Sequence, residues 1–202
     1  MKRIAPFIIV VSLIGMLFTT SCGHKKVKYR LAQIDTLTIL LDKTELMLNE
    51  INNDSITAML KEVQQKNEAI YPVSHTKLNM KERSDYFQFT SVEKQFKSYL
   101  NDHIKNLDEL KLSRKQITDL KTDVENHAIK DKKFDEYYLT ENTSVNTLFN
   151  MVKSSLYKLK QNTEKYNLFN PIITKLMNDK KIKVETEGAK KSEKEAEGEE
   201  DD

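Results

Sequence analysis

The chain has 202 residues, 38% of them apolar, and Ile, Leu, Val, Met and Phe make up 46 of the residues from 31 to 180, which predicts a packed core. The 164 residues from His24 to Glu187 contain no glycine, which excludes P-loop and Rossmann nucleotide-binding folds and argues strongly against turn-rich β-sandwiches. The formal net charge is +2, but residues 31–180 carry 22 basic and 22 acidic side chains, without the basic stripe typical of nucleic-acid-binding proteins.

The first 22 residues have the features of a secretory leader. Lys2 and Arg3 form a charged start, Ile4 to Phe18 is a mostly apolar run, and small residues lead up to Cys22. Fifteen helical residues rise about 22 Å, which is short of the roughly 30 Å hydrocarbon core of a bilayer. The pattern therefore predicts a signal peptide over residues 1–21 and not a permanent membrane-spanning helix.

Cys22 is the only cysteine, and it lies in the stretch Leu17-Phe18-Thr19-Thr20-Ser21-Cys22-Gly23. This stretch resembles the lipobox of bacterial lipoproteins, although Thr19 stands where that family prefers leucine. The resemblance implies that Cys22 is diacylated on sulfur and becomes the new N-terminus. It further implies a periplasm-facing protein held in the outer membrane more readily than the inner, because Gly23 and not aspartate follows the cysteine. The alternative is an ordinary secretory leader with an incidental cysteine.

Residues 22–29 form the expected lipidated tether. Two or three acyl chains hold a protein on a membrane essentially permanently, whereas one chain binds only marginally. Acylation of the one cysteine would leave no thiol for disulfides, thiol chemistry or metal binding. The basic residues of this region either attract anionic lipid headgroups or only keep the tether hydrated: Lys25, Lys26, Lys28 and Arg30.

The first long segment of the body, from about Tyr29 to Ile70, has a helical apolar stripe. Residues 52–55, Asn-Asn-Asp-Ser, interrupt it, which predicts either a kink with Asp54 as N-cap of a restarted helix or a tolerated polar turn. Residues 71–79 are expected to form a short loop around Pro72. The apolar stripe consists of Leu31, Ile34, Leu37, Leu41, Leu48 and Ile51.

The second segment has the most regular spacing, and it predicts coiled-coil-like packing over about five heptads. Arg114 stands in the expected seam, where it either snorkels or pairs with a carboxylate of a neighbouring helix. His103 borders the stripe as a core or boundary residue, whereas His75 and His127 fall in or near turns. The expected seam consists of Phe89, Val92, Phe96, Leu100, Ile104, Leu107, Leu110, Ile117, Leu120 and Val124.

The third segment begins near Asp131, a plausible N-cap, and continues the helical spacing to Tyr166. Asn170 and Pro171 form a cap-and-first-turn pair, which predicts that a last helix restarts there. From residue 184 to 202 the chain is rich in Glu, Lys, Ala and Gly without an apolar period, which predicts a disordered acidic tail.

Three long helical segments joined by short connections predict an all-α fold, an elongated antiparallel three-helix bundle over residues 30–180. At 1.5 Å per residue the bundle would be roughly 60 to 70 Å long. In such a bundle the turn after Ile70 would form a tip distal to the anchor. Aromatic residues gather there in sequence and either plug the bundle or bind a partner: Tyr71, Tyr86, Phe87 and Phe89.

No motif for catalysis, cofactor binding or metal binding emerges from the sequence. Neither HExxH nor a Glu-x-x-His pair occurs, and no serine lies in a glycine-cornered elbow, so catalytic, cofactor and metal residues are all predicted to be none. Asp35-Thr36-Leu37 and Asp54-Ser55-Ile56 resemble sites of protein O-glycosylation in some envelope bacteria. Capping by Asp54 and an ordinary helical place for Asp35 are the alternatives.

The preferred function is a non-enzymatic, membrane-anchored helical module that binds or spaces other envelope proteins. The expected contacts are the membrane through the lipid on Cys22 and an envelope protein at the distal tip, without nucleic acid, cofactor or small-molecule substrate. The body resembles small all-helical lipoproteins of bacterial envelopes in composition and layout. The alternative is a periplasmic carrier or holding chaperone that clasps unfolded chains or lipids.

Overall fold

The computed structural model describes residues 5–184, and their side chains from residue 25 onward. Residues 1–4 of the expected leader, the side chains of residues 5–24, that of Cys22 included, and residues 185–202 of the expected tail lie outside what the structure describes. Helices make up 91% of what is described, and no strand occurs between residues 5 and 184. The predicted all-α class is therefore confirmed.

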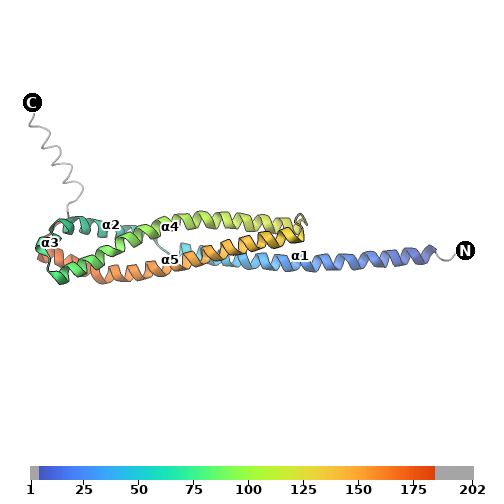
Figure 1. Cartoon of the computed structure of the whole chain (residues 1–202), viewed down its shortest axis with the longest axis horizontal. Helices are drawn as coiled ribbons and strands as arrows, with labels where there is room; N and C mark the ends of the chain where they lie inside the picture. Colours follow the sequence, from blue (N-terminus) through green and yellow to red (C-terminus); the bar gives the residue numbers. More distant parts are fainter. Residues whose placement is uncertain (1–4, 185–202) are drawn as a thin grey trace, which may run out of the picture. The chain divides into compact units, whose positions relative to one another are not determined.

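Four long helices and two short ones follow one another in the chain (Figure 1). They are α1 (Ala5–Asn49), α2 (Asn53–Ile70), the 3₁₀ helix η1 (Tyr71–Val73), α3 (Ser74–Lys77), α4 (Met80–Glu125) and α5 (Asp131–Asp179). Among these helices, none has a stretch that is both long and apolar enough to cross a membrane. The expected loop at residues 71–79 is wrong in detail, because most of it is helical.

The first predicted segment consists of two separate helices, because residues 50–52 break the helix after Asn49. The N-cap of α2 is Asn52, not Asp54, and its side chain accepts a hydrogen bond of 3.1 Å from the backbone N–H of Ser55. Asp54 lies in the first turn, where a carboxylate favours the positive end of the helix dipole. The three-helix count expected for the chain is therefore replaced by four long helices.

The last predicted restart is wrong, since α5 continues through Pro171 to Asp179. A proline inside a helix removes one backbone hydrogen bond and costs about 3 kcal/mol. Burial of Ile173, Leu176 and Met177, which follow the proline and are 0–6% exposed, offsets that cost. Asp131, which the sequence predicts as the N-cap, is instead the first helical residue of α5.

The helices form two compact units, and α4 and α5 each contribute to both. Unit 1 comprises Met1–Leu48 and Asn106–Val152, and unit 2 comprises Asn49–Lys105 and Lys153–Asp202. In unit 1, α1 pairs with α4 through Arg114, which donates to Asp42 (2.8 Å) and Glu45 (2.6 Å). Of the two alternatives predicted for Arg114, snorkelling and pairing with a carboxylate of a neighbouring helix, this contact confirms the pairing.

Helices α1 and α4 run in opposite directions within unit 1. Lys121 of α4 donates to Asp35 of α1 (2.9 Å), so higher numbers in α4 meet lower numbers in α1 and the two helices are antiparallel. Arg30 of α1 donates to Asp131 of α5 (2.7 Å), and its guanidinium lies 4.6 Å from the centre of the Phe134 ring. The predicted apolar stripe of α1 lines this core, with Ile34, Leu37, Leu41 and Leu48 at most 2% exposed.

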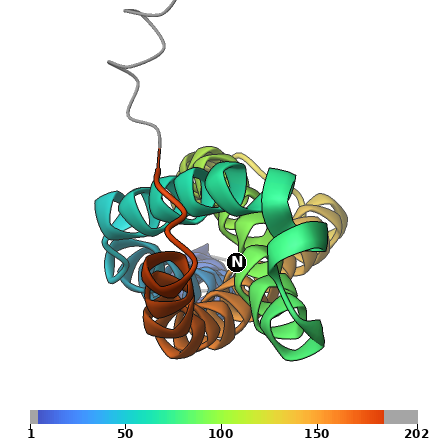
Figure 2. The ribbon, with the colours of Figure 1, turned by 90° about the vertical axis from the view of Figure 1, so that its left-hand side faces the viewer.

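Unit 2 contains α2, η1, α3, the first part of α4 and the last part of α5. Its core joins Val63 and Ile70 of α2 with Phe89 and Phe96 of α4 and Ile173 of α5, all fully buried. The start of α4 carries a capping box, in which the N–H of Glu82 donates to Asn79 and the N–H of Asn79 donates to Glu82. Figure 2 views unit 2 from the side of α3 and the end of α5.

Candidate functional site

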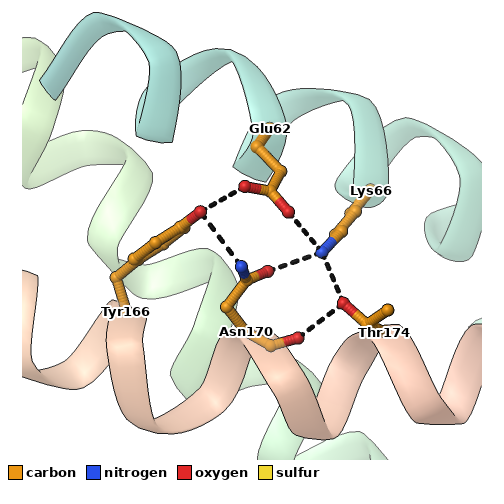
Figure 3. Close-up of polar contacts among 5 residues, drawn as sticks. All are labelled: Glu62, Lys66, Tyr166, Asn170 and Thr174. Atoms are coloured by element: carbon orange, nitrogen blue, oxygen red, sulfur yellow. Dashed lines mark hydrogen bonds and ion pairs between the residues drawn. The ribbon is translucent and has the colours of Figure 1, made fainter. Parts of the chain in front are cut away.

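The most concentrated group of polar side chains in unit 2 joins α2 to α5 (Figure 3). We call it the Lys66 cluster; its members are Glu62, Lys66, Tyr166, Asn170 and Thr174. The Lys66 ammonium donates to Glu62 (2.6 Å), to the Asn170 side-chain carbonyl (2.5 Å) and to Thr174 Oγ1 (2.7 Å). These bonds use all three ammonium protons, as a buried lysine requires.

The cluster continues from Glu62 to Tyr166. The Tyr166 hydroxyl donates to the second carboxylate oxygen of Glu62 and accepts a bond of 3.0 Å from the Asn170 amide. Two members of the cluster are buried, since Lys66 is 8% and Tyr166 is 7% exposed. The Tyr166 ring packs 6.2 Å from the Phe89 and Phe96 rings, so the polar cluster borders directly on the aromatic core.

Electrostatics in the Lys66 cluster favour ionised Glu62. Burial alone would raise the pKa of Glu62, but hydrogen bonds from Lys66, Tyr166 and Asn170 together hold that pKa below its usual value of 4.5. Burial, reinforced by Glu62, raises the pKa of the Tyr166 hydroxyl above its usual range. Glu62 is therefore a charged acceptor and Tyr166 a neutral donor at physiological pH.

A second polar group connects α2 to α4. Glu93 accepts bonds from Lys97 (2.7 Å) and Gln64 (3.3 Å), and these hold its pKa below the usual value. The Tyr86 hydroxyl donates to the side chain of Asn67, and burial raises the pKa of Tyr86 to about 12. Helix α2 is thus held by polar contacts on one side to α5 and on the other to α4.

The histidines lie where the sequence predicts. His103 is 8% exposed and lies beside Tyr99, 3.5 Å between its Nδ1 and the hydroxyl, and burial lowers its pKa. His75 is exposed in α3, and His127 is exposed in the turn after α4 with a positive φ of 54°. Within the part of the chain that the structure describes, no three His, Cys, Asp or Glu side chains are placed to hold a metal ion.

The four aromatic residues expected at the tip have different environments. Phe89 is fully buried and is part of the core, and Tyr86 is half-buried through its bond to Asn67. Tyr71 and Phe87 are both 68% exposed. The plug alternative is therefore confirmed for Phe89 and Tyr86, which fill the unit, whereas Tyr71 and Phe87 face solvent and partner binding by them stays a prediction.

The two candidate glycosylation motifs both place an exposed hydroxyl residue in a helix. Thr36 is exposed on α1, but its hydroxyl donates to the carbonyl of Ala32 (3.0 Å) and its neighbour Asp35 pairs with Lys121. Ser55 is exposed in the first turn of α2, where its backbone N–H is bonded to the Asn52 cap. The ordinary helical place expected for Asp35 is confirmed, whereas the capping expected of Asp54 is wrong, because Asn52 is the N-cap of α2.

Unit 1 has a shallow groove of about 210 Å³ between α4 and α5. One carboxylate oxygen of Glu141 is buried there without a hydrogen-bond partner among the described residues. Burial and the nearby charge of Glu109 raise the pKa of Glu141 above its usual value. The groove is lined by Gln116, Asp119, Leu120, Asp123, Tyr137 and Glu141.

Only part of the Lys66 cluster is visible in the sequence. Glu62 and Lys66 are four residues apart in a helix, a spacing that predicts a surface ion pair. Their partners in α5 lie 104 and 108 residues further along the chain, and sequence spacing contains no signal for that approach.

Comparison with known proteins adds no assignment to this geometry: no family model matches the chain, and neither a curated protein nor a solved structure shows significant similarity to it.

Proposed function

We propose that this protein is a lipid-anchored, non-enzymatic helical module of a bacterial envelope, which faces the periplasm and presents unit 2 to a partner. The observation that carries the proposal is that the buried polar side chains of unit 2 bond to one another across helices. The ammonium of the buried Lys66 donates all its protons to side chains of α2 and α5. Its role is to hold helices in register.

A module that binds or spaces other proteins needs a stable surface more than a reactive centre. Polar contacts between helices favour one alignment of the helices over others, because a shift by one turn would leave buried charges unpaired. Arg114 and Lys121 serve the same purpose in unit 1. We infer that each unit is a three-helix bundle with coiled-coil-like packing, and that the exposed Tyr71 and Phe87 belong to the docking surface.

The anchor is tested at Cys22. Cells that express the wild-type chain should incorporate an alkyne fatty acid into the protein and retain it in the membrane fraction, because two or more acyl chains bind a membrane essentially permanently. Cys22→Ser should abolish both the label and the membrane fractionation. A Cys22→Ser protein that stays labelled and membrane-bound would refute the anchor.

The docking surface is tested at Phe87, with Tyr86 as the matched neighbour. Phe87→Ala should reduce partner capture from envelope extracts without a change in melting temperature, because the ring is exposed. Tyr86→Ala should lower the melting temperature, because it removes the bond to Asn67. Full capture by Phe87→Ala would exclude this surface.

A further inference from the structure

The balanced charge of the body conceals an uneven division between the two units. The described residues from 25 to 48 and from 106 to 152, in unit 1, carry 12 basic and 12 acidic side chains. Those from 49 to 105 and from 153 to 184, in unit 2, carry 16 basic and 10 acidic side chains. The positive charge of the folded part of the chain therefore belongs to unit 2.

Most of this excess lies in two segments that meet. Residues 71–87 and 171–184 together hold seven Lys and Arg against three Asp and Glu, and we call this region the basic end of unit 2. Lys180 lies 3.2 Å from Glu82, and Leu78 belongs to the same core cluster as Met177. Figure 2 shows α3 and the end of α5 on the same side of the unit.

The lysines of the basic end are accessible to a ligand. Within residues 25–184, Lys180 is the one basic residue of this end that pairs with a carboxylate. The others lie in α3, in the first turn of α4, in the last part of α5 and in the residues just after it. Five of them are exposed lysines: Lys77, Lys81, Lys175, Lys181 and Lys183. Charges that have no carboxylate partner among residues 25–184 are available to attract an anion.

Exposed apolar side chains accompany these lysines. Met80 is 87% exposed, and Tyr71 and Phe87 are each 68% exposed. Met80 and Phe87 are seven residues apart in α4, so they lie on the same face of the helix. Lysines beside exposed aromatic and apolar side chains are the combination found in proteins that bind the interface of an anionic bilayer.

We propose that the basic end of unit 2 binds an anionic lipid surface, with the lysines at the headgroups and Met80, Tyr71 and Phe87 in the interfacial layer. This proposal rests on the proposed function for the docking surface at Tyr71 and Phe87, and it assigns to that surface a lipid bilayer in place of a protein. An acidic protein segment would satisfy the charge. A bilayer interface accepts the charge and also covers the three exposed apolar side chains, which favours it.

Residues 185–202 are a competing occupant by charge alone. They carry nine acidic and three basic side chains, and they follow directly on the basic end in the chain. They contain no Ile, Leu, Val, Met, Phe or Tyr, so they offer nothing to cover the exposed apolar side chains. The test therefore needs a readout at the basic end itself.

A fluorophore at a single cysteine supplies that readout. The full chain with Cys22→Ser and Ser84→Cys carries one thiol on the exposed face of α4, between Met80 and Phe87. An environment-sensitive label there should shift to the blue with vesicles of phosphatidylcholine containing about 30% phosphatidylglycerol, and not with phosphatidylcholine alone. The matched control, Thr118→Cys in unit 1, should not shift, so apolar insertion of the leader is not mistaken for binding.

Variants that remove a lysine charge or an apolar ring test which side chains of the basic end contact the vesicle. Lys77→Gln, Lys81→Gln and Lys175→Gln should each weaken vesicle binding about five-fold, whereas Lys43→Gln in unit 1 should leave it unchanged. Salt of about 1 M should abolish the shift, since the Debye length is then only about 3 Å. Phe87→Ala should reduce the shift at the same lysine charge.

Three outcomes would overturn the proposal. One is no shift at Ser84→Cys with anionic vesicles in the full chain. Another is a shift that appears only when the chain ends at Val184, which would identify the acidic residues 185–202 as the occupant. The third is a shift with polyglutamate but not with vesicles, which would identify an acidic protein partner. Fatty-acid labelling of Cys22 and partner capture through Phe87 would still stand or fall independently.

Discussion

Lys66 shows how a single charged residue is accommodated in a helical core. Lysine is almost never fully buried unless it is paired, and here the side chain is 8% exposed with three oxygen acceptors around its ammonium. The Nζ also lies 5.9 Å from the centre of the Phe89 ring, which adds a cation–π attraction. The residue stabilises unit 2 through all of these contacts together.

Removal of Lys66 should therefore destabilise unit 2. Lys66→Ala is expected to lower the free energy of unfolding by about 1 to 3 kcal/mol, because Asn170, Thr174 and Glu62 all lose a donor. Lys61→Ala, an exposed lysine of the same helix, should change it by less than about 0.5 kcal/mol. Urea unfolding followed by circular dichroism measures both. Equal effects of the two variants would show that the cluster contributes nothing.

The carboxylates of the two polar groups also predict a pH dependence. The pKa values of Glu62 and Glu93 are lower in the folded chain than the ordinary 4.5, so the unfolded chain binds protons first as the pH falls. The stabilisation from both is complete above about pH 4.5 and is lost as the pH falls through the folded pKa values. Burial lowers the pKa of His103 below 6.5, so the unfolded chain also binds this proton first. His103 therefore adds to the loss of folding stability as the pH falls below about 6.5.

Thermal melts between pH 7 and pH 3 test this expectation. The melting temperature should fall with pH, and Glu62→Gln should make the fall less steep than in the wild type. Glu68→Gln on the exposed face of α2 is the matched control. A melting temperature that is flat down to pH 3 would contradict the assignment of ionised Glu62.

At the scale of a helix, the buried positions of α4 form a regular seam that differs from the one predicted from its apolar residues. Its buried positions alternate strictly by three and four residues: Phe89, Val92, Phe96, Tyr99, His103, Asn106, Leu110, Ser113, Ile117, Leu120 and Val124. The sequence-based seam instead passed through Leu100, Ile104 and Leu107 and placed Arg114 where Ser113 lies. Ile104 is 62% exposed, and Leu100 and Leu107 are half-buried, so that part of the prediction is wrong.

The reason is that backbone geometry, and not side-chain type, selects the inward face. Phe96 and Leu110 both face inward and are 14 positions apart, which is two heptads. A period of 3.5 therefore places Tyr99, His103 and Asn106 on the same face. Burial of polar residues in a helical seam is a known way to specify register. Asn106 and Ser113 are the residues of α4 that fit this role within unit 1.

Alanine substitutions along α4 distinguish the two registers. Ile117→Ala is expected to cost about 2 to 4 kcal/mol, because the side chain is 3% exposed and its loss leaves a cavity. Ile104→Ala should cost less than about 0.5 kcal/mol. The free energy of unfolding from urea titrations decides the matter, and a large cost at Ile104 would restore the sequence-based seam.

At the scale of the whole molecule, the division into two units changes how the composition is interpreted. The chain as a whole has a formal net charge of +2, which by itself suggests no preference for charged partners. Divided at the unit boundaries, the described part has a balanced unit 1 and a basic unit 2. Because α4 and α5 each belong to both units, this uneven charge cannot be found by counting the charges of one helix at a time.

The sequence by itself determined that the chain is helical, because a glycine-free body with amphipathic periodicity leaves few other ways to bury its apolar residues. It also determined most of the apolar stripes of α1 and α5, which depend on local spacing, whereas for Arg114 it offered pairing only as one of two alternatives. The polar stretch 52–55 already offered the break before α2 as one of two alternatives, and the structure has the break, with Asn52 as the cap. The tertiary structure alone decided the continuation of α5 through Pro171, the polar seam of α4 and the partners of Lys66. Each of these depends on which helices pack together across separations of up to 108 residues, and no local pattern in the chain encodes that contact.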